Sequence, residues 1–207
     1  SLFDRLPDGA ASKLMPRPPM AADLARLLLA REVLAEGADR AVWLDADSFV
    51  FAPDRLILPD APYAFGREVW VQPNGDGRLR VFRNVHNAFC LFGVGNPVLD
   101  FLIEAATRIA LRLDGPASPQ LLGPKLLTAL HNIVGFPLIE TAGAASPLVL
   151  RDLAAGGGPA LDKLRAEPPA PAVLNLCASL VGRESDGVAV DEALIETAMA
   201  ALAEGAL

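Results

Sequence analysis

Two carboxylates, two residues apart, are the side chains of this chain best suited to chemistry. Asp45 and Asp47 lie in the segment Leu44-Asp45-Ala46-Asp47-Ser48, at the end of an apolar run that predicts a strand over residues 41–45. Because side chains alternate along a strand, both acids would point the same way at its carboxyl end, where ligands of α/β sheets collect. Like charges repel unless a proton or a cation lies between them, and hard oxygen ligands favour Mg²⁺ or Mn²⁺. The pair predicts a divalent-cation site that takes a diphosphate; the alternative is a solvated turn with two acids.

A second polar pair, Asp23 and Arg26, precedes this strand. The two residues are three positions apart on a predicted helix, so they share one of its faces. One interpretation is that they reach over the strand end and hydrogen-bond a polar ligand. The other is an exposed ion pair, which contributes only about 0.3 kcal/mol.

The elements that position these residues can be predicted from apolar periodicity, caps and turn residues. Helices are expected over 20–36, from an Asn96 cap to about Leu113, over 124–134, and onward from an Asp191 cap. Strands are expected at 41–45, 49–51, 62–66, 88–93, 137–141, 147–150 and 173–177, with a hairpin joining 69–72 to 79–83. A helix, a short loop and a buried strand ending in acids are typical of an α/β fold with a mostly parallel central sheet flanked by helices.

The length of 207 residues predicts a single domain. Within it we expect an irregular segment over 1–19 and a core over 20–150 that carries the acid pair. Residues 151–207 then supply a lid-like loop at Gly156–Gly158, followed by a strand and a helix.

Composition excludes several classes of protein. Hydrophobic residues make up 52% of the chain, which excludes a disordered protein, and the formal net charge of -7 argues against a nucleic-acid partner. Charged residues, Gly and Pro interrupt every apolar stretch before the ~18 residues of a transmembrane segment, and no signal peptide is expected at the start. Cys90 and Cys177 are the only cysteines, too few for a disulfide framework or a thiolate zinc site, so we expect a cytoplasmic protein.

The remaining candidates each have a structural interpretation beside a functional one. His86 and His131 could touch a ligand, although lone histidines are more often structural. Trp70, in the predicted hairpin, could stack on a sugar. The arginines of the second hairpin strand form a solvated face or contact an anionic acceptor; they are Arg78, Arg80 and Arg83.

Five segments in register resemble the DXD glycosyltransferases, which are metal-dependent enzymes of the GT-A fold. They are Ala22-Asp23-Leu24-Ala25-Arg26, Val42-Trp43-Leu44-Asp45-Ala46-Asp47, Tyr63-Ala64-Phe65-Gly66, Asn87-Ala88-Phe89-Cys90 with Gly95-Asn96-Pro97, and Gly123-Pro124-Lys125-Leu126-Leu127-Thr128. The resemblance spans about residues 20–140 and is closest to the bacterial capsule-type and Och-like mannosyltransferases and the clostridial toxin glucosyltransferases. Gly37-Ala38-Asp39-Arg40, before the acid pair, is more similar to glycogenin-type enzymes.

The resemblance implies retaining transfer of a sugar from a UDP- or GDP-sugar to a hydroxyl of a glycan, lipid-linked or protein acceptor, with Mn²⁺ or Mg²⁺ as cofactor, in polysaccharide biosynthesis. It implies that Asp47 ligates the metal, that Asp45 binds the sugar or ribose and reaches the metal through water, and that Asn175 stands where the family often has a metal-ligating His. It also implies that donor-sugar hydroxyls meet Asp23 and Arg26, and that the donor and acceptor pocket is lined by Asn87, Gly123 and Pro124. No catalytic nucleophile is identified.

The family begins with a strand and a helix that help to hold the nucleotide base, and this chain begins after them. We therefore expect a fragment, a partner chain or oligomer that supplies this part, or a degenerate base site. Three other interpretations stay open: a non-catalytic sugar- or nucleotide-binding relative, a haloacid-dehalogenase-type phosphatase with Asp45 as nucleophile, and a structural protein whose acids are surface residues.

Overall fold

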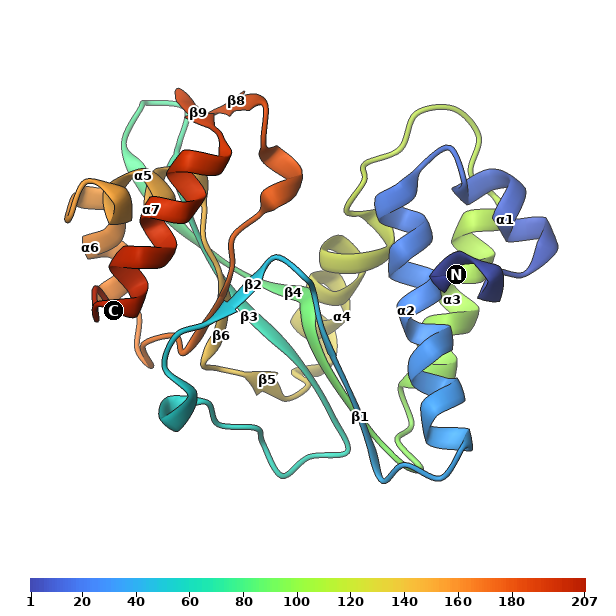
Figure 1. Ribbon diagram of the computed structural model, residues 1–207. Helices are drawn as coiled ribbons and strands as arrows, with labels where there is room; N and C mark the ends of the chain where they lie inside the picture. The colour runs from blue at the N-terminus through green and yellow to red at the C-terminus, as the bar shows by residue number, and fades with distance from the viewer. The chain divides into compact units, whose positions relative to one another are not determined.

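The computed structural model describes residues 1–207 and confirms the α/β class (Figure 1). Contacts group the residues into two compact units. Unit 1 comprises Ser1–Leu44, Pro59–Phe65 and Val85–Leu138, and unit 2 comprises Asp45–Leu58, Gly66–Asn84 and Ile139–Leu207. The single domain expected from the sequence stays a prediction.

Unit 1 is mainly helical. It contains α1 (Asp8–Leu14), α2 (Pro18–Ala35), β1 (Arg40–Leu44), α3 (Leu99–Leu111) and α4 (Leu126–Val134), with a 3-10 helix at Leu2–Arg5 and a π-helical turn at Leu121–Lys125. Its apolar core is formed largely by α2 and α3, which pack side by side (Figure 1). The most deeply buried side chains of this core include Leu14, Met20, Leu24, Leu102 and Phe92.

Unit 2 has its own core, between strands and the C-terminal helices. Its elements are β2 (Ser48–Val50), a 3-10 helix at Pro53–Arg55, β6 (Ala142–Ala144), α5 (Pro147–Ala154), α6 (Pro159–Arg165), β7 (Val173–Asn175), a 3-10 helix at Ala178–Leu180, β8 (Arg183–Ser185), β9 (Val188–Val190) and α7 (Glu192–Ala203). Helix α5 packs against both α6 and α7. Strands β3 (Tyr63–Pro73), β4 (Leu79–Gly93) and β5 (Leu138–Ile139) contribute residues to both units.

The sheets are mixed, which corrects the expectation of a mostly parallel sheet. The largest sheet has the order β1-β4-β3-β5, and β1 runs antiparallel to β4 with Trp43 opposite Cys90. In the order β2-β7-β6, β2 is antiparallel to β7, whereas β6 is parallel to it. The expectation assumed that helices connect neighbouring parallel strands, but the neighbour of β1 is the second strand of a hairpin.

Two segments differ in type from the prediction. Residues 1–19 are not irregular: Ser1 and Asp4 form a capping box at the first 3-10 helix, and α1 starts directly after Pro7. The strand expected at 147–150 is the helix α5, because Ser146 Oγ accepts a hydrogen bond from Val149 N and Pro147 suits the first helical turn. Both predictions were wrong because proline residues and apolar runs were interpreted without the serine caps that precede them, Ser1 and Ser146.

The loop expected to act as a lid is a short connection between two helices. Gly156–Gly158 joins α5 to α6, and the carboxylate of Asp152 accepts hydrogen bonds from the first backbone N–H groups of α6, at Ala160 (2.7 Å) and Leu161 (3.2 Å). A Cβ atom on Gly158 would collide with this carboxylate. The glycine therefore lets Asp152 cap α6.

None of the helices combines the length and the apolar character needed to cross a bilayer.

Candidate functional site

In unit 1, Asp23 and Arg26 form a buried ion pair on α2. Arg26 Nη2 lies 3.3 Å from Asp23 Oδ1, and the two side chains are only 8% and 7% exposed. The alternative of an exposed pair is therefore wrong. Arg26 Cζ also lies 5.2 Å from the centroid of the Trp43 ring on β1, within the range of a cation–π contact. A buried charge without a partner is costly, so the two side chains must stay in contact. Their geometry is therefore fixed.

Asn87, on β4, completes a network with this pair. Its Nδ2 donates to Asp23 Oδ1 at 2.7 Å, and its backbone carbonyl accepts a hydrogen bond from Arg26 Nη1 at 2.6 Å. The same carbonyl accepts a hydrogen bond from Cys90 Sγ at 3.2 Å. Three residues for which the resemblance implies donor contacts are thus brought together within unit 1.

Gly123 lies against this network in the π-helical turn that precedes α4. Its backbone is non-helical, with φ −105° and ψ −108°. A Cβ atom at this position would lie 2.6 Å from Asn87 Nδ2 and 2.9 Å from Asp23 Oδ2. Only glycine therefore fits without displacing the two side chains. Pro124 follows in the same turn.

The cavity beside this network is small. It has a volume of about 10 Å³ and is lined by Asp23, Asn87 and Cys90 with five apolar side chains. This is room for about one water molecule, so no sugar ring fits inside it. Any donor contact of these residues is therefore limited to their slightly exposed edges.

In unit 2, Asp45 and Asp47 lie in a turn and not on a strand. β1 ends at Leu44 and β2 begins at Ser48, whose N–H donates to Asp45 O at 3.0 Å across the turn. Strand alternation therefore does not apply to these two residues, and the expectation that both acids point the same way stays a prediction. The chain bends at once after the apolar run, so the alternation rule stops at Leu44.

Asp47 is held by partners from the far end of the sequence. Its Oδ1 accepts a hydrogen bond from Asn175 Nδ2 at 2.6 Å, and its Oδ2 accepts one from Ala178 N at 3.0 Å. Asn175 is the last residue of β7, is 7% exposed, and directs its Oδ1 to the N–H of Cys177 at 2.9 Å. Asn175 thus orients Asp47 with its amide nitrogen while its oxygen satisfies the backbone.

The carboxylate of Asp47 keeps acceptor capacity beyond its two hydrogen bonds. The two carboxylate oxygens of Asp47 each accept one hydrogen bond, and each keeps a further lone pair. No group of three or more His, Cys, Asp or Glu side chains is arranged to hold a metal ion. Mg²⁺ in proteins is commonly bound by one or two carboxylates together with substrate phosphates, so such a group is not required. The direct ligand role of Asn175 stays a prediction.

Two residues of this cluster have raised pKa values and were not singled out as site residues from the sequence. Burial, and then the negative charges of Asp47, Glu68 and Asp45, raise the pKa of the Cys177 thiol to about 12. Burial also raises the pKa of Glu68, against a lowering effect of the hydrogen bond from Asn84 Nδ2 at 2.8 Å. Three carboxylates of unit 2 therefore act on one thiol. The left-handed backbone of Cys177 (φ 52°), unusual for a residue other than glycine, could not be seen in the sequence.

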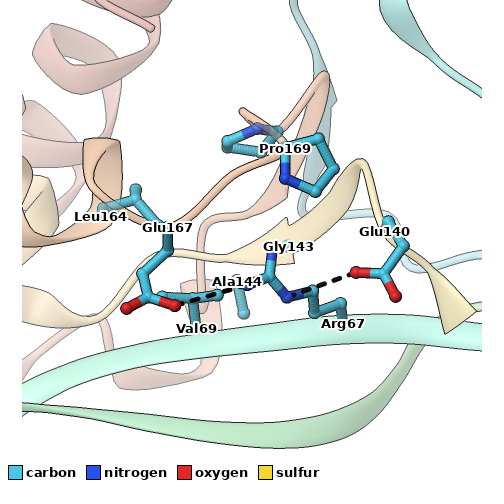
Figure 2. Close-up of a pocket in the computed structure, with 9 residues that line it drawn as sticks. Arg67, Val69, Glu140, Gly143, Ala144, Leu164, Glu167 and Pro169 are labelled. Carbon is cyan, nitrogen blue, oxygen red and sulfur yellow. Dashed lines mark hydrogen bonds and ion pairs between the residues drawn. The ribbon is translucent and has the colours of Figure 1, made fainter.

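A separate charged cluster in unit 2 surrounds Arg67 (Figure 2). Its guanidinium lies between Glu140, at 3.4 Å, and Glu167, at 3.5 Å, and Arg83 Nη2 lies 2.6 Å from the other carboxylate oxygen of Glu167. The adjoining cavity has a volume of about 10 Å³. The two arginines of the cluster balance the two glutamates, and the cavity has room for only about one water molecule. The cluster is therefore a structural connection between β3 and the segment after α6.

The other candidates are placed as follows. His86 is buried, and its Nδ1 accepts a hydrogen bond from Ala88 N at 3.2 Å. His131, on α4, packs edge-on against Phe136 with ring centroids 4.9 Å apart, and its buried Nδ1 has no hydrogen-bond partner. Arg83 pairs with Glu167, whereas Arg78 and Arg80 form no ion pair.

Comparison with known proteins gives no relative: no family model matches the chain, and neither a curated protein nor a solved structure matches it.

Proposed function

We propose that this chain is a metal-dependent glycosyltransferase that moves a sugar from a UDP- or GDP-sugar to a hydroxyl acceptor. The observation that carries the proposal is the fixed carboxylate of Asp47. It lies in the turn directly before β2, is oriented by Asn175 and Ala178 N, and keeps lone pairs for a cation. Orientation by such outer partners is what metal-ligating carboxylates commonly have.

The residues of unit 2 would hold Mn²⁺ or Mg²⁺ through Asp47, with Asp45 contacting the metal through water. When bound, the cation neutralises the charge of the leaving diphosphate. Without a bound cation, the raised pKa keeps the thiol of Cys177 protonated at neutral pH.

The donor-hydroxyl contacts that the resemblance implies for Asp23 and Arg26 stay a separate prediction about unit 1. The buried network with Asn87 and Gly123 fixes both side chains. A fixed hydrogen-bonding group loses little freedom when a ligand binds, and this favours a positioning role.

Calorimetric titration of the purified chain with UDP and with GDP, each with and without Mn²⁺, tests the proposal. We expect binding of one nucleotide that requires Mn²⁺ and that is lost in Asp47→Asn. Asp54→Asn is the matched control, because Asp54 is an exposed acid of the same unit. Absence of Mn²⁺-dependent binding, or equal binding by both variants, would contradict the proposal.

Turnover separates the enzyme from a binding module. We expect Mn²⁺-dependent release of the free sugar from UDP- or GDP-sugars, measured by chromatography, and its loss in Asp47→Asn. Nucleotide binding without any release would instead support the non-catalytic relative. Release of phosphate from a generic phosphate ester, abolished by Asp45→Asn, would support the phosphatase.

A further inference from the structure

The β3–β4 hairpin of unit 2 has two faces of different character. Its turn is closed by hydrogen bonds from Asn74 N to Arg78 O and from Gly77 N to Asn74 O, both at 2.9 Å. Counting outward from the Asn74–Arg78 pair places Gln72 opposite Arg80, and Trp70 opposite Phe82. The hydrogen bond between Asn84 and Glu68, the next pair along this face, agrees with this register.

The odd-numbered side chains of the hairpin face the core of unit 2. Val69 and Val71 are buried there, and Leu79 and Val81 pack against the same core. Trp70 and Phe82 belong to neither apolar core. Because neighbouring side chains of a strand point to opposite faces, the even-numbered residues form the other face.

This even face joins two aromatic rings to an unpaired guanidinium. Phe82 is 37% exposed, and Trp70 is half-buried. Neither ring contacts another aromatic ring. Arg80 is exposed and forms no ion pair, in a chain whose formal net charge is -7. The face therefore presents two aromatic rings and one guanidinium that forms no ion pair.

The even face extends from Glu68, which accepts the hydrogen bond from Asn84, to Gln72 near the hairpin turn. Between these two residues the strand advances by about 13 Å, which is the span of a short oligosaccharide. The face is therefore long enough to contact more than one sugar ring.

We propose that this face, formed by Trp70, Phe82 and Arg80, binds a carboxylate-bearing sugar chain as the acceptor. The interpretation of this face as an acceptor surface rests on the proposed glycosyltransferase function. Aromatic rings bury the apolar C–H faces of sugar rings, and a guanidinium binds a carboxylate through two parallel hydrogen bonds. Arg83 takes no part, since it lies on the opposite face and pairs with Glu167.

The test is calorimetric titration of the whole chain, without nucleotide or metal, with a hyaluronan hexasaccharide. We expect Phe82→Ala and Trp70→Ala each to weaken its binding about fivefold, and Arg80→Gln about tenfold. Matched controls are Phe101→Ala and Arg112→Gln, which change exposed residues of unit 1 and should leave the affinity unchanged. If Trp70→Ala lowers the melting temperature, the more exposed Phe82→Ala supplies the aromatic test.

Two further probes identify the ligand class. Neutral chitohexaose should bind more weakly than hyaluronan and should be insensitive to Arg80→Gln, because it has no carboxylate. Tetraglutamate should not bind. Equal binding of tetraglutamate would indicate an acidic peptide and overturn the proposal, as would absence of hyaluronan binding or insensitivity to all three substitutions.

The same titrations separate this inference from the proposed function. If Mn²⁺-dependent nucleotide binding holds and hyaluronan fails to bind, only the acceptor surface is wrong. If hyaluronan binds as expected and no nucleotide does, the face is a glycan-binding surface and the transferase proposal is wrong.

Discussion

Asn175 donates a hydrogen bond of 2.6 Å to the carboxylate of Asp47, from a position 128 residues further along the chain. The resemblance to DXD glycosyltransferases implies that Asn175 is a metal ligand. In the structure its oxygen accepts from Cys177 N, while its nitrogen holds Asp47. The two hydrogen bonds show that Asn175 orients the carboxylate of Asp47, while its own role as a metal ligand stays a prediction.

Asn175→Ala should weaken the Mn²⁺-dependent binding of UDP or GDP by about tenfold, because loss of an outer partner frees the ligating carboxylate to rotate. Calorimetric titration measures the change. Asn132→Ala is the control, since Asn132 is exposed on α4. Unchanged affinity in Asn175→Ala would show that Asp47 needs no such partner.

Asp23→Asn should destabilise the protein by about 3 kcal/mol, because it removes a carboxylate that pairs with the buried Arg26. Urea denaturation at neutral pH measures the free energy of unfolding. The control is Arg108→Gln, which breaks an exposed ion pair with Glu104 on α3 and should cost at most about 0.5 kcal/mol. Equal small losses in both variants would mean that the buried pair is dispensable for stability.

Gly123→Ala should destabilise unit 1 by about 1–3 kcal/mol, because the new Cβ must displace the amide of Asn87 or the carboxylate of Asp23. The same substitution at Gly75 is the control, since a Cβ there meets no atom within 4 Å. Thermal unfolding of both variants measures the difference. A Gly123→Ala protein as stable as Gly75→Ala would show that the network gives way at little cost.

Local signals predicted most of the elements correctly. The helix expected over 20–36 is α2, which starts slightly earlier because Pro18 and Pro19 suit the first turn of a helix. The cap expected at Asp191 is confirmed by its hydrogen bond to Leu194 N at 2.8 Å. These features depend on residues a few positions apart, which a single sequence displays directly.

Long-range pairing could not be predicted in the same way. The antiparallel pairing of β1 with β4 and the contact of Asn175 with Asp47 join segments far apart in the sequence. No local pattern encodes them. Apolar runs also leave helix and strand undecided, as at 147–150, where the Ser146 cap decides for a helix. The sequence therefore predicted which residues form the candidate site, whereas the distances between them follow only from the fold.

Cys177 should react slowly with iodoacetamide across the neutral range. Only the thiolate attacks, and with a pKa of about 12 the thiolate fraction at pH 8 is about 10³-fold lower than for an ordinary cysteine. We expect the rate, followed by peptide mass spectrometry, to rise about tenfold per pH unit up to pH 10 without a plateau. The urea-unfolded chain is the reference for an ordinary thiol.

Asp47→Asn should speed the reaction of Cys177 with iodoacetamide, since it removes one of the charges that disfavour the thiolate. A plateau below pH 9, or no effect of Asp47→Asn, would contradict the charge arrangement around Cys177. Because the unfolded thiol ionises first as pH rises, the same raised pKa also predicts a loss of stability above about pH 9 that Cys177→Ala abolishes.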